Sequence, residues 1–392
     1  MNKRPKLRFK EFSGDWESKK LHQVSDVLSG KRVPKGMSLV EYNTGIPYIT
    51  VSDMGNKYID LNRLKYITPK IEEYIKKYKV LTNDIIISVA GTLGKINLIQ
   101  SELKNANLTE NCDKITNLKN TNYKYLYYYL NTEHIQNQIS SVNTISSQPK
   151  LALACIRDFN ISTPNLEEQE KIASFFSLID EKISLQGEKI DALKDYKKGM
   201  MQKIFSDELR FKDDEGRDYP EWEEKKLESV VNKKKKGKNP VYAESGNILL
   251  NNEYMENNTD PLYVENEIDV NKEDILILWD GSQAGKIYTG FTGVLGSTFT
   301  AITLDKYNCN RFIYQQLIYN LDKIQIAWRE GSGVPHVAKD FIENFKIKVP
   351  VLEDQRKISK LLDGIDTKLK KEQEKLDFLN EYKKGLLQQM FV

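Results

Sequence analysis

The sequence predicts an α+β protein in which two strand-rich globular regions alternate with two long helices. A heptad pattern that occurs twice, over residues 164–205 and 350–391, predicts the helices. Short β-branched runs that end in glycine turns predict the strands between them. At 392 residues the chain has room for two or three domains, each with a core of its own.

The two helical segments are copies of one another. They align without a gap at a constant offset of 186 residues, which separates Pro164 from Pro350. Self-similarity over so long an interval indicates a duplicated architecture, so we predict an internal pseudo-twofold repeat. The matching residues include Gln169/Gln355, Ile179-Asp180/Ile365-Asp366 and Tyr196–Gly199/Tyr382–Gly385.

Each copy has apolar residues at alternating steps of three and four, which is the seam of a coiled coil. A helix of this length spans roughly 60 Å at 1.5 Å per residue, and it cannot bury such a stripe alone. We therefore expect the two copies to pack against each other, although packing of each helix on its own globular region is the alternative. The predicted seam residues are Ile172, Phe176, Ile179, Ile183, Ile190 and Leu193 in the first copy, and Ile358, Leu362, Ile365, Leu369, Leu376 and Leu379 in the second.

Polar residues interrupt the seam at matching positions, Gln186/Glu372 and Lys197/Lys383. Such residues cost stability but fix the register and the partner of a helix. The repeat thus divides the chain into residues 1–163, 164–206, 207–349 and 350–392, in the order globular region, helix, globular region, helix.

The globular regions also repeat one another. Their opening phrases match at Trp16/Trp222 and Leu21/Leu227. Each then has a predicted buried strand, a glycine turn and a helix. These are Asp84–Ala90, Gly91–Lys95 and Asn122–Ser140 in the first region, and Asp274–Trp279, Asp280–Lys286 and Arg311–Leu321 in the second. We predict a basic loop at Val230–Lys238.

The composition excludes several classes of protein. With 59 Lys+Arg and 56 Asp+Glu the net charge is only +3, so any nucleic-acid surface must be local. The three cysteines are far apart and suggest neither a disulfide framework nor a zinc site. We see no secretory leader and no apolar run near 18 residues, and so expect a soluble cytoplasmic protein.

These features together resemble the specificity (S) subunits of type I restriction–modification systems. The resemblance rests on the repeated helix heads at Pro164 and Pro350, the repeated Tyr-Lys-Lys-Gly, the strand-and-glycine turns and the two tryptophan phrases, and it covers nearly the whole chain. It implies two target-recognition domains, residues 1–163 and 207–349, separated by two antiparallel coiled-coil helices.

The resemblance also implies the function and the partners. Each domain would read one half of a bipartite, asymmetric site on double-stranded DNA. The helices would dock methyltransferase subunits, two in number, which in turn recruit restriction subunits. S-adenosylmethionine would bind the methyltransferase subunits, and ATP and Mg would bind the restriction subunits. The chain itself would be non-catalytic and carry no cofactor or metal.

Candidate phosphate contacts lie in two basic clusters that follow the matching opening phrases. Lysine and arginine contacts to phosphate supply affinity and salt dependence without sequence choice. Lys95 and Lys286, at the ends of the glycine turns, are further candidates. A solvated surface and a purely structural turn are the alternatives. The clusters are Lys31, Arg32 and Lys35 in the first region, and Lys233–Lys236 with Lys238 in the second, where Lys235, Lys236 and Lys238 are the chosen candidates.

Candidate base contacts are polar side chains in the loops, because Arg pairs with guanine, Asn or Gln with adenine, and Ser or Thr with either. His336 is an ordinary loop residue in the alternative interpretation. The tyrosines at 123–129 fit a helix core better than a stacking platform for bases. The candidates are Ser52, Thr92, Asn143, Ser147 and Gln148 in the first region, and Ser282, Gln283, Arg329, Ser332 and His336 in the second.

Two motifs that suggest chemistry depart from their patterns, one in spacing and one in residue type. Gly281–Lys286 has three residues between its glycines and Ile287 after the lysine, whereas a phosphate-binding P-loop needs four and a Ser or Thr. Asn239–Tyr242 resembles the Asn-Pro-Pro-Tyr loop of amino-methyltransferases but has Val241 in place of the second proline. A non-catalytic DNA reader is thus the favoured hypothesis, and a coiled-coil scaffold that binds proteins is the alternative.

Overall fold

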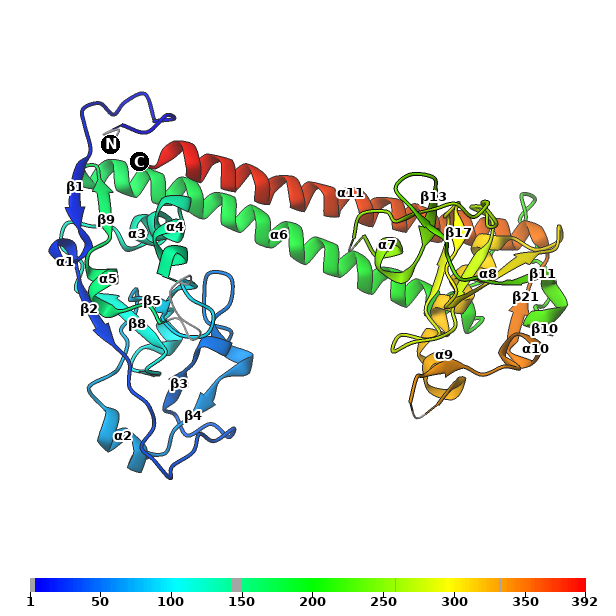
Figure 1. Cartoon of the computed structure of the whole chain (residues 1–392), viewed down its shortest axis with the longest axis horizontal. Helices are drawn as coiled ribbons and strands as arrows, with labels where there is room; N and C mark the ends of the chain where they lie inside the picture. Colours follow the sequence, from blue (N-terminus) through cyan, green and yellow to red (C-terminus); the bar gives the residue numbers. More distant parts are fainter. Residues whose placement is uncertain (1–3, 143–149, 258, 332) are drawn as a thin grey trace. The chain divides into compact units, whose positions relative to one another are not determined.

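The computed structural model describes residues 4–142, 150–257, 259–331 and 333–392 (Figure 1). The chain divides into two compact units, which we call unit 1 (residues 1–187 and 375–392) and unit 2 (residues 188–374). Two long helices, α6 (Leu166–Phe205) and α11 (Leu352–Met390), each contribute to both units. Each predicted heptad segment is therefore one continuous helix.

Unit 1 contains two main sheets. All their pairings are antiparallel except that of β3 with β7. The first sheet has the order β2 (Asp26–Ser29), β8 (Cys112–Thr116), β5 (Ile85–Ser88), β6 (Ile96–Leu98), and the second has the order β4 (Lys65–Tyr66), β3 (Pro47–Ile49), β7 (Asn107–Leu108). The first sheet is buried on both faces, since Ile85 and Ile87 pack into the core that α6 shares, and Ile86 packs towards the second sheet. This explains the unbroken β-branched run.

Unit 2 repeats this arrangement with different side chains. Ile275 and Ile277 pack into one core, whereas Leu276 and Leu278 pack into another. The parallel pair is here β13 with β17. The first sheet has the order β11 (Val231–Lys236), β18 (Phe299–Leu304), β15 (Ile275–Leu278), β16 (Ile287–Thr289), and the second has the order β12 (Tyr242–Ala243), β14 (Tyr263–Val264), β13 (Asn247–Leu250), β17 (Val294–Leu295).

Two local predictions are wrong. The lysine run at Val230–Lys238 is not a loop: it forms β11, an edge strand whose exposed lysines are typical of sheet edges. The predicted helix Asn122–Ser140 is two helices, α3 (Tyr123–Leu130) and α4 (Glu133–Val142). Asn131 caps the end of α3 and interrupts the helix there. The counterparts in unit 2 are α8 (Asn310–Tyr319) and α9 (Leu321–Ala327).

The opening segments pair with the last strand of each globular region. β1 (Glu17–Lys20) is antiparallel to β9 (Asn160–Thr163), and β10 (Glu223–Lys226) is antiparallel to β21 (Lys346–Val349). In unit 1 the Leu7 amide also donates to the Gln389 carbonyl at 2.9 Å, so both ends of the chain meet there (Figure 1).

The remaining elements are short. Unit 1 has α1 (Leu21–Val24), η1 (Val51–Asp53), η2 (Leu61–Arg63), α2 (Pro69–Ile75), η3 (Ser101–Leu103) and α5 (Leu153–Arg157); unit 2 has η4 (Leu227–Val230), α7 (Asn252–Met255), α10 (Phe341–Asn344) and the hairpin of β19 (Arg329–Glu330) and β20 (His336–Val337). Among the described residues, no helix is both long enough and apolar enough to cross a bilayer.

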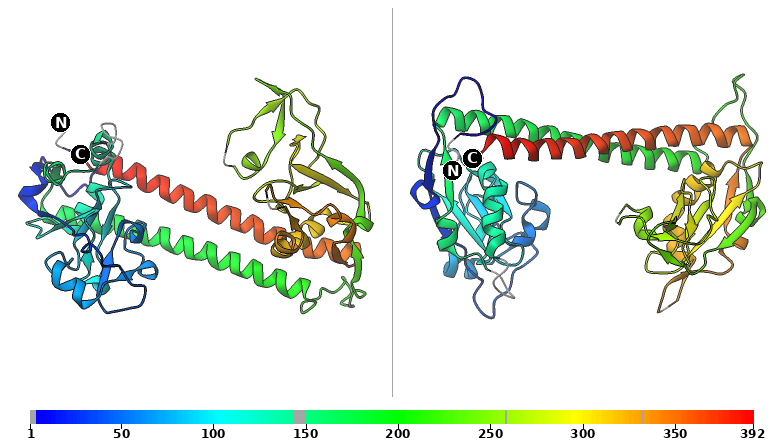
Figure 2. Two further views of the ribbon diagram at one scale, coloured as in Figure 1. Left: turned by 60° about the horizontal axis from the view of Figure 1, so that its bottom comes forward. Right: turned by 45° about the horizontal axis from the view of Figure 1, so that its top comes forward.

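The long helices pack together, and in both units they run in opposite directions (Figure 2). Most predicted seam residues are buried, and Ile183, Leu193, Leu369 and Leu376 are half-buried. The outer parts of the seam have a second neighbour as well. Ile172, Phe176 and Ile179 belong to the core of unit 1, and Ile358, Leu362 and Ile365 belong to the core of unit 2. Each helix therefore buries its stripe against both the other helix and a globular region.

Candidate nucleic-acid interface

In unit 1 the strands β2 and β5 finish at the same end of the first sheet. Both run antiparallel to β8 between them, with Ser29 opposite Asp113 and Ser88 opposite Cys112. The chain therefore continues from one sheet end both into the basic cluster at residues 31–35 and into the glycine turn at residues 91–95.

Unit 2 has the same geometry. β11 and β15 flank β18, with Lys236 opposite Thr300 and Leu278 opposite Phe299. Lys238 and the turn at residues 280–286 thus leave one sheet end together. We call this end of each first sheet, with the loops that leave it, the recognition face.

A glycine fixes the path of the chain at each basic cluster: Gly30 comes immediately before Lys31, and Gly237 lies between Lys236 and Lys238. A Cβ atom on Gly30 would lie 2.0 Å from the Thr109 carbonyl oxygen, and one on Gly237 would lie 1.9 Å from the Gly296 carbonyl oxygen. No other residue fits at either position. Sequence reasoning missed this pair, although a lone glycine beside or within a basic run is a visible signal.

The basic candidates differ in how exposed their charges are. Lys31 and Lys35 are exposed, and the Arg32 guanidinium is paired with Glu110. In unit 2, Lys236 and Lys238 are exposed, whereas the Lys235 ammonium is 3.1 Å from the Asp269 carboxylate. Among the described residues, no carboxylate is paired with Lys31, Lys35, Lys236 or Lys238, so these lysines can reach a phosphate without giving up an ion pair.

Lys95 and Lys286 have acceptors inside their own units. Lys95 donates to the Met54 carbonyl and so ties its turn to the segment that contains Ser52. Lys286 is paired with Glu256, whose carboxylate also accepts the Tyr288 hydroxyl at 2.9 Å. This geometry favours the structural alternative for both lysines: they hold the glycine turns in place.

The polar candidates of unit 2 gather at the recognition face. The Gly281 amide donates to the Pro335 carbonyl at 2.8 Å, which joins the glycine turn to the β19–β20 hairpin. Arg329 donates to the Ser282 carbonyl at 3.3 Å, and Asn252 donates to the Gln283 side chain at 3.1 Å. His336 forms an isolated bridge with Asp280. Four candidates predicted from separate loops, Ser282, Gln283, Arg329 and His336, are thus neighbours.

In unit 1 the described candidates are Ser52 and Thr92, and both are exposed. Ser52 lies in η1, and its hydroxyl is hydrogen-bonded to the Thr50 hydroxyl at 2.8 Å. A bridge between Ala90 and Lys150 brings a third segment beside the turn. Asn143, Ser147 and Gln148, and Ser332 of unit 2, lie outside the described residues.

The tyrosine cluster is helix core, as predicted. Tyr125, Tyr127, Tyr128 and Tyr129 are all buried. Burial raises the pKa of each of their hydroxyls, and Tyr128 donates to the Asp180 carboxylate at 2.6 Å. These rings are therefore not available for stacking on bases.

A repeated ion pair joins the two long helices. In unit 1 the Lys383 ammonium lies 2.6 Å from the Asp180 carboxylate, and in unit 2 Lys197 lies 2.6 Å from Asp366. The four residues are two matching pairs of the repeat, which explains why the sequence keeps both the Ile-Asp step and the lysine of Tyr-Lys-Lys-Gly. Lys197 and Lys383, two of the predicted polar seam positions, thus form ion pairs between the helices, and their role in fixing the register stays a prediction.

Each globular region adds its own cation to this pair. Lys57 reaches Asp180 at 2.6 Å in unit 1, whereas in unit 2 Arg311 lies 3.9 Å from Asp366 and pairs more closely with Asp363, at 2.5 Å. Burial raises the pKa of Asp180, but Lys383, Lys57 and Tyr128 outweigh it and hold the pKa below its ordinary value. Burial is also the main reason that the pKa of Lys57 is lowered.

The repeated glutamine docks each helix head on its globular region. Gln169 accepts the Asn122 amide at 2.9 Å, just before α3, and donates to the Pro164 carbonyl at 2.9 Å. Gln355 does the same with the Cys309 amide at 2.7 Å, just before α8, and its own helix head. Two otherwise unsatisfied backbone groups are paired in each unit by one side chain.

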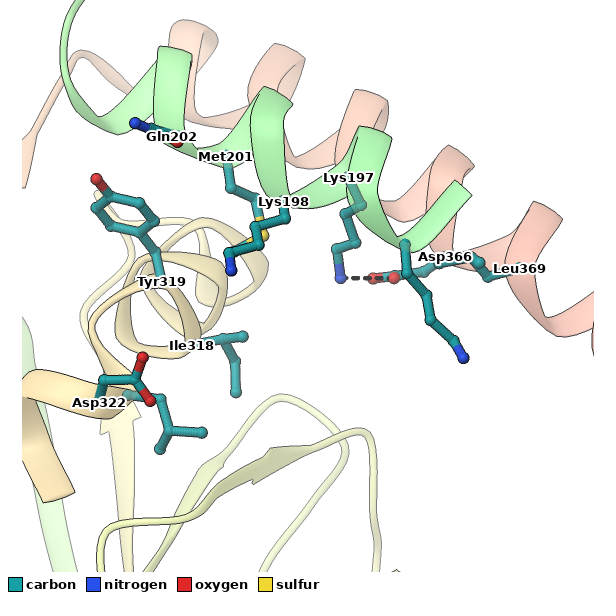
Figure 3. A pocket seen from close by; sticks show the side chains of 11 residues that line it. Lys197, Lys198, Met201, Gln202, Ile318, Tyr319, Asp322, Asp366 and Leu369 are labelled. Atoms are coloured by element: carbon teal, nitrogen blue, oxygen red, sulfur yellow. Dashed lines mark hydrogen bonds and ion pairs between the residues drawn. The ribbon is translucent and has the colours of Figure 1, made fainter. Parts of the chain in front are cut away.

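Cavities lie beside the ion pairs. In unit 2 a cavity of about 430 Å³ has an apolar floor that includes Met201 and Ile318, and Lys198 and Asp322 line its rim next to the Lys197–Asp366 pair (Figure 3). In unit 1 a cavity of about 840 Å³ is lined by Lys57, Asp180 and Lys383. The helices and the globular regions therefore leave space on one side of each ion pair.

The described part of the chain contains no cluster of three or more His, Cys, Asp or Glu side chains placed to hold a metal ion. Burial raises the pKa of the Cys112 thiol, so this cysteine is unsuited to act as a nucleophile. The geometry is that of two surfaces, each with exposed cations and hydrogen-bonding side chains on a rigid frame.

Known proteins share both the sequence and the fold. The family model of the type I restriction modification DNA specificity domain matches residues 13–195 and 219–380. The MjaVIII specificity subunit of Methanocaldococcus jannaschii is 34% identical over 48% of this chain and 46% of its own length, so that match spans about half of the relative. The putative MjaX specificity subunit of the same organism is 26% identical over 97% of this chain and 94% of its own.

The solved structures agree at the level of the fold. The S subunit from M. genitalium superposes with a TM-score of 0.61 at 18% identity, covering 99% of both chains. A chain from work on complex assembly and conformational transition of the type I R-M system also has a TM-score of 0.61, at 16% identity, covering 95% of this chain and 96% of that one. The two matches of the family model span both globular regions and most of both long helices. This chain belongs to the family of type I restriction–modification DNA specificity subunits, the non-catalytic subunits that recognise the target site within the complex.

Proposed function

We propose that the recognition face of each unit reads one half of a bipartite DNA site. The observation that carries this is the shared geometry: in both units, the strand that ends at or just before the exposed lysines and the strand before the glycine turn finish at one sheet end. Lysines and hydrogen-bonding side chains are thereby presented together, as a reader of duplex DNA requires. We take residues 1–163 and 207–349 as the two target-recognition domains.

The two kinds of side chain have different tasks. Lys31 and Lys35 in unit 1, and Lys236 and Lys238 in unit 2, contact phosphates and supply most of the affinity. Thr92 in unit 1, together with Ser52, and the group of Ser282, Gln283, Arg329 and His336 in unit 2 lie nearest to the bases. Arg329 paired with guanine and Gln283 paired with adenine are the strongest possible contacts of this set.

The site is asymmetric because the frames match while the reading side chains do not. The glycine turn of unit 1 offers Thr92, and that of unit 2 offers Ser282 and Gln283 in a turn one residue longer. Different donors and acceptors at the same place select different bases. The ion pairs and glutamine contacts that are alike in both units carry no such choice.

The helices are the surface for the catalytic partners. Two methyltransferase subunits dock along them and methylate an adenine in each half-site, with S-adenosylmethionine as their cofactor. Restriction subunits with ATP and Mg join through them. A base must leave the duplex to be methylated, so this chain holds the DNA while its partner extrudes the base. Because the complex acts on cellular DNA, the protein functions in the cytoplasm.

The test removes exposed lysines from the recognition face of unit 2 and compares the effect on DNA binding with that of removing a lysine at the opposite end of the same sheet. We expect Lys236→Ala with Lys238→Ala, in the complex with methyltransferase subunits, to weaken DNA binding for all sequences. The slope of log affinity against log salt should fall by roughly 0.9 for each phosphate that is no longer neutralised by a lysine. Lys306→Ala is the matched control, because Lys306 is exposed and follows the other end of β18.

Base readout is tested separately at Gln283. Gln283→Ala should leave the salt slope unchanged and relax the choice at one base pair of a single half-site, which a methylated-adenine map of the genome records. If the lysine pair and Lys306 behave alike, and no variant alters the methylated motif, the recognition face is misplaced. If the complex is indifferent to DNA of any sequence, the protein-binding scaffold is the correct function.

A further inference from the structure

An apolar strip on the long helices of unit 1 has no partner within the described chain. It consists of Leu178 and Leu185 on α6 and of Phe378 and Tyr382 on α11, which are 65%, 57%, 63% and 48% exposed. The Phe378 and Tyr382 rings are stacked, with centroids 6.1 Å apart and planes at 12°. Four large apolar side chains are thus held in water on two neighbouring helices. Contiguous patches of this kind mark interaction sites.

The four residues lie on one flank of the helix pair. Leu178, Leu185 and Phe378 each precede a seam position, so in antiparallel helices they face the same side. The ion pair of Asp180 with Lys383 shows which residues of the two antiparallel helices lie opposite each other, and by this alignment Leu185 of α6 lies close to Phe378 of α11. The globular region covers the other flank, where Asp180 meets Tyr128 and Lys57.

The strip has the features of a second helix seam. Leu178 and Leu185 are seven residues apart, which is the interval that keeps knobs in line for another helix. Gly385, close to the level of Leu178, would accept a Cβ with nothing within 4 Å. A glycine inside a helix costs about 1 kcal/mol relative to alanine, and nothing within the described chain requires it here. It leaves room for the close approach of a partner.

Positive charge beside the strip indicates which kind of partner it fits. Lys182 and Lys375 are exposed on the same flank, between the apolar residues of the strip. The surface therefore fits an amphipathic helix that carries an apolar stripe with acidic residues beside it.

The equivalent flank of unit 2 has much less apolar surface. At the positions that match Leu178, Leu185 and Phe378, the chain has Gly364, Lys371 and Ala192. The residues that match Tyr382, Gly385, Lys182 and Lys375 are unchanged in kind, namely Tyr196, Gly199, Lys368 and Lys189. Tyr196 is 54% exposed, and its counterpart Tyr382 is 48% exposed. The two flanks share these four residues, and unit 1 adds three large apolar side chains to them.

We propose that the two flanks bind the same helical surface of a methyltransferase subunit with unequal affinity, and that the flank of unit 1 binds more tightly. This inference rests on the proposed function, in which two such subunits dock on the helices. Assembly then passes through a complex with one methyltransferase subunit, seated on unit 1. The second subunit joins only at a higher concentration.

The experiment exchanges the three differing residues between the flanks of the full chain. Leu178→Gly, Leu185→Lys and Phe378→Ala give unit 1 the surface of unit 2, and Gly364→Leu, Lys371→Leu and Ala192→Phe do the reverse. Native mass spectrometry of the chain titrated with its methyltransferase subunit reads each complex. For the unaltered chain we expect two dissociation constants at least about tenfold apart, since buried aromatic anchors dominate interfaces. The first variant should bring them within about threefold, and the second should tighten the weaker one.

Controls separate binding from folding. Tyr307→Ala removes an aromatic side chain that is 67% exposed in a loop of unit 2, and it should change neither constant. Thermal unfolding should shift only slightly in both exchange variants: Leu178→Gly adds a glycine inside α6 and should cost about 1 kcal/mol, whereas Gly364→Leu removes one from α11 and should return a similar amount. Equal affinities in the unaltered chain, or a first variant that binds as tightly as the unaltered chain, would overturn the inequality. Self-association of the chain that depends on the strip would overturn it too, because the occupant would then be a second copy.

Failure of the proposed function would look different. The complex would not bind its methylated motif, whatever the order in which methyltransferase subunits join. Equal docking of both subunits with sequence-specific DNA binding intact would refute only the inequality.

Discussion

Asp180→Asn should destabilise unit 1 by about 3 kcal/mol. The carboxylate is only 16% exposed and accepts from Lys57, Tyr128 and Lys383, each at 2.6 Å. Removal of one member of a buried ion pair costs about 3–5 kcal/mol, because the remaining charges stay buried without a partner. Partial exposure to water puts this site at the lower end of that range. Asparagine keeps the size of the side chain, so packing is preserved.

The matching residue of the repeat provides an internal comparison. Asp366 is 34% exposed and has one close cation, Lys197 at 2.6 Å, with Arg311 at 3.9 Å. More exposed pairs of this kind contribute about 1 kcal/mol or less. Asp366→Asn should therefore cost unit 2 about a third of what Asp180→Asn costs unit 1.

The assay must report on each unit by itself, because a chain with two units need not unfold in one step. Amide hydrogen exchange of α6 in urea, followed by mass spectrometry, separates residues 166–187 from residues 188–205. Glu181→Gln is the matched control, since this neighbouring carboxylate is exposed, and we expect a change within about 0.5 kcal/mol. Equal losses for Asp180→Asn and Glu181→Gln would refute the idea that the buried charge cluster locks the helices.

Three further outcomes are expected. The stability lost through Asp180→Asn should shrink as the pH falls below about 4. The pKa of Asp180 is lower in the folded than in the unfolded protein, so its contribution to stability is complete above the unfolded pKa and disappears as the pH falls through the folded pKa. Urea unfolding at several pH values measures this change. Gly237→Ala should destabilise unit 2 by about 1–3 kcal/mol and weaken DNA binding at one half-site, because the new Cβ meets the Gly296 carbonyl oxygen. Gly364→Ala is the control: its Cβ would have nothing within 4 Å, so it should be neutral or stabilising by about 1 kcal/mol. Insertion of one heptad in each long helix, after residues 187 and 374, should lengthen the preferred spacer between half-sites by about three base pairs, since seven helical residues add roughly 10 Å. A methylation map should show the longer spacer with both half-site sequences unchanged. An unchanged spacer would contradict a spacing role for the helices.

Much of the framework could be predicted because it depends on periodicity and repetition. The heptad pattern is a property of the chain itself, and it predicted α6 and α11 as single helices. The buried strand at Asp84 was visible for the same reason, since a strand covered on both faces has an unbroken apolar run. The duplication then allowed each element of the second region to be paired with one in the first.

Pairing across the chain could not be predicted in the same way. No local pattern says that Lys57 reaches Asp180, or that Lys286 is held by Glu256. The lysine run of β11 has the composition of a loop, but its backbone pairs with β18, and tertiary context overrode propensity there. The order of the strands in the sheets, which brings Thr92 and Lys31 to one end, depends on the same long-range pairing.

The residues that recur in both units and those that do not have separate tasks. Gln169/Gln355, Asp180/Asp366 and Lys197/Lys383 all act where helices meet helices or globular regions, and the glutamine contact and the lysine–aspartate pair use the same atoms in both copies. Their geometry does not depend on which DNA sequence is read. Ser282 and Gln283 have only Thr92 as a counterpart, and they contact nothing that fixes the helices. Replacement of these side chains can therefore change the target at one half-site while the helix register, and with it the docking of the partners, stays the same. A variant of Gln283 that shifted the affinity for a methyltransferase subunit would contradict this separation.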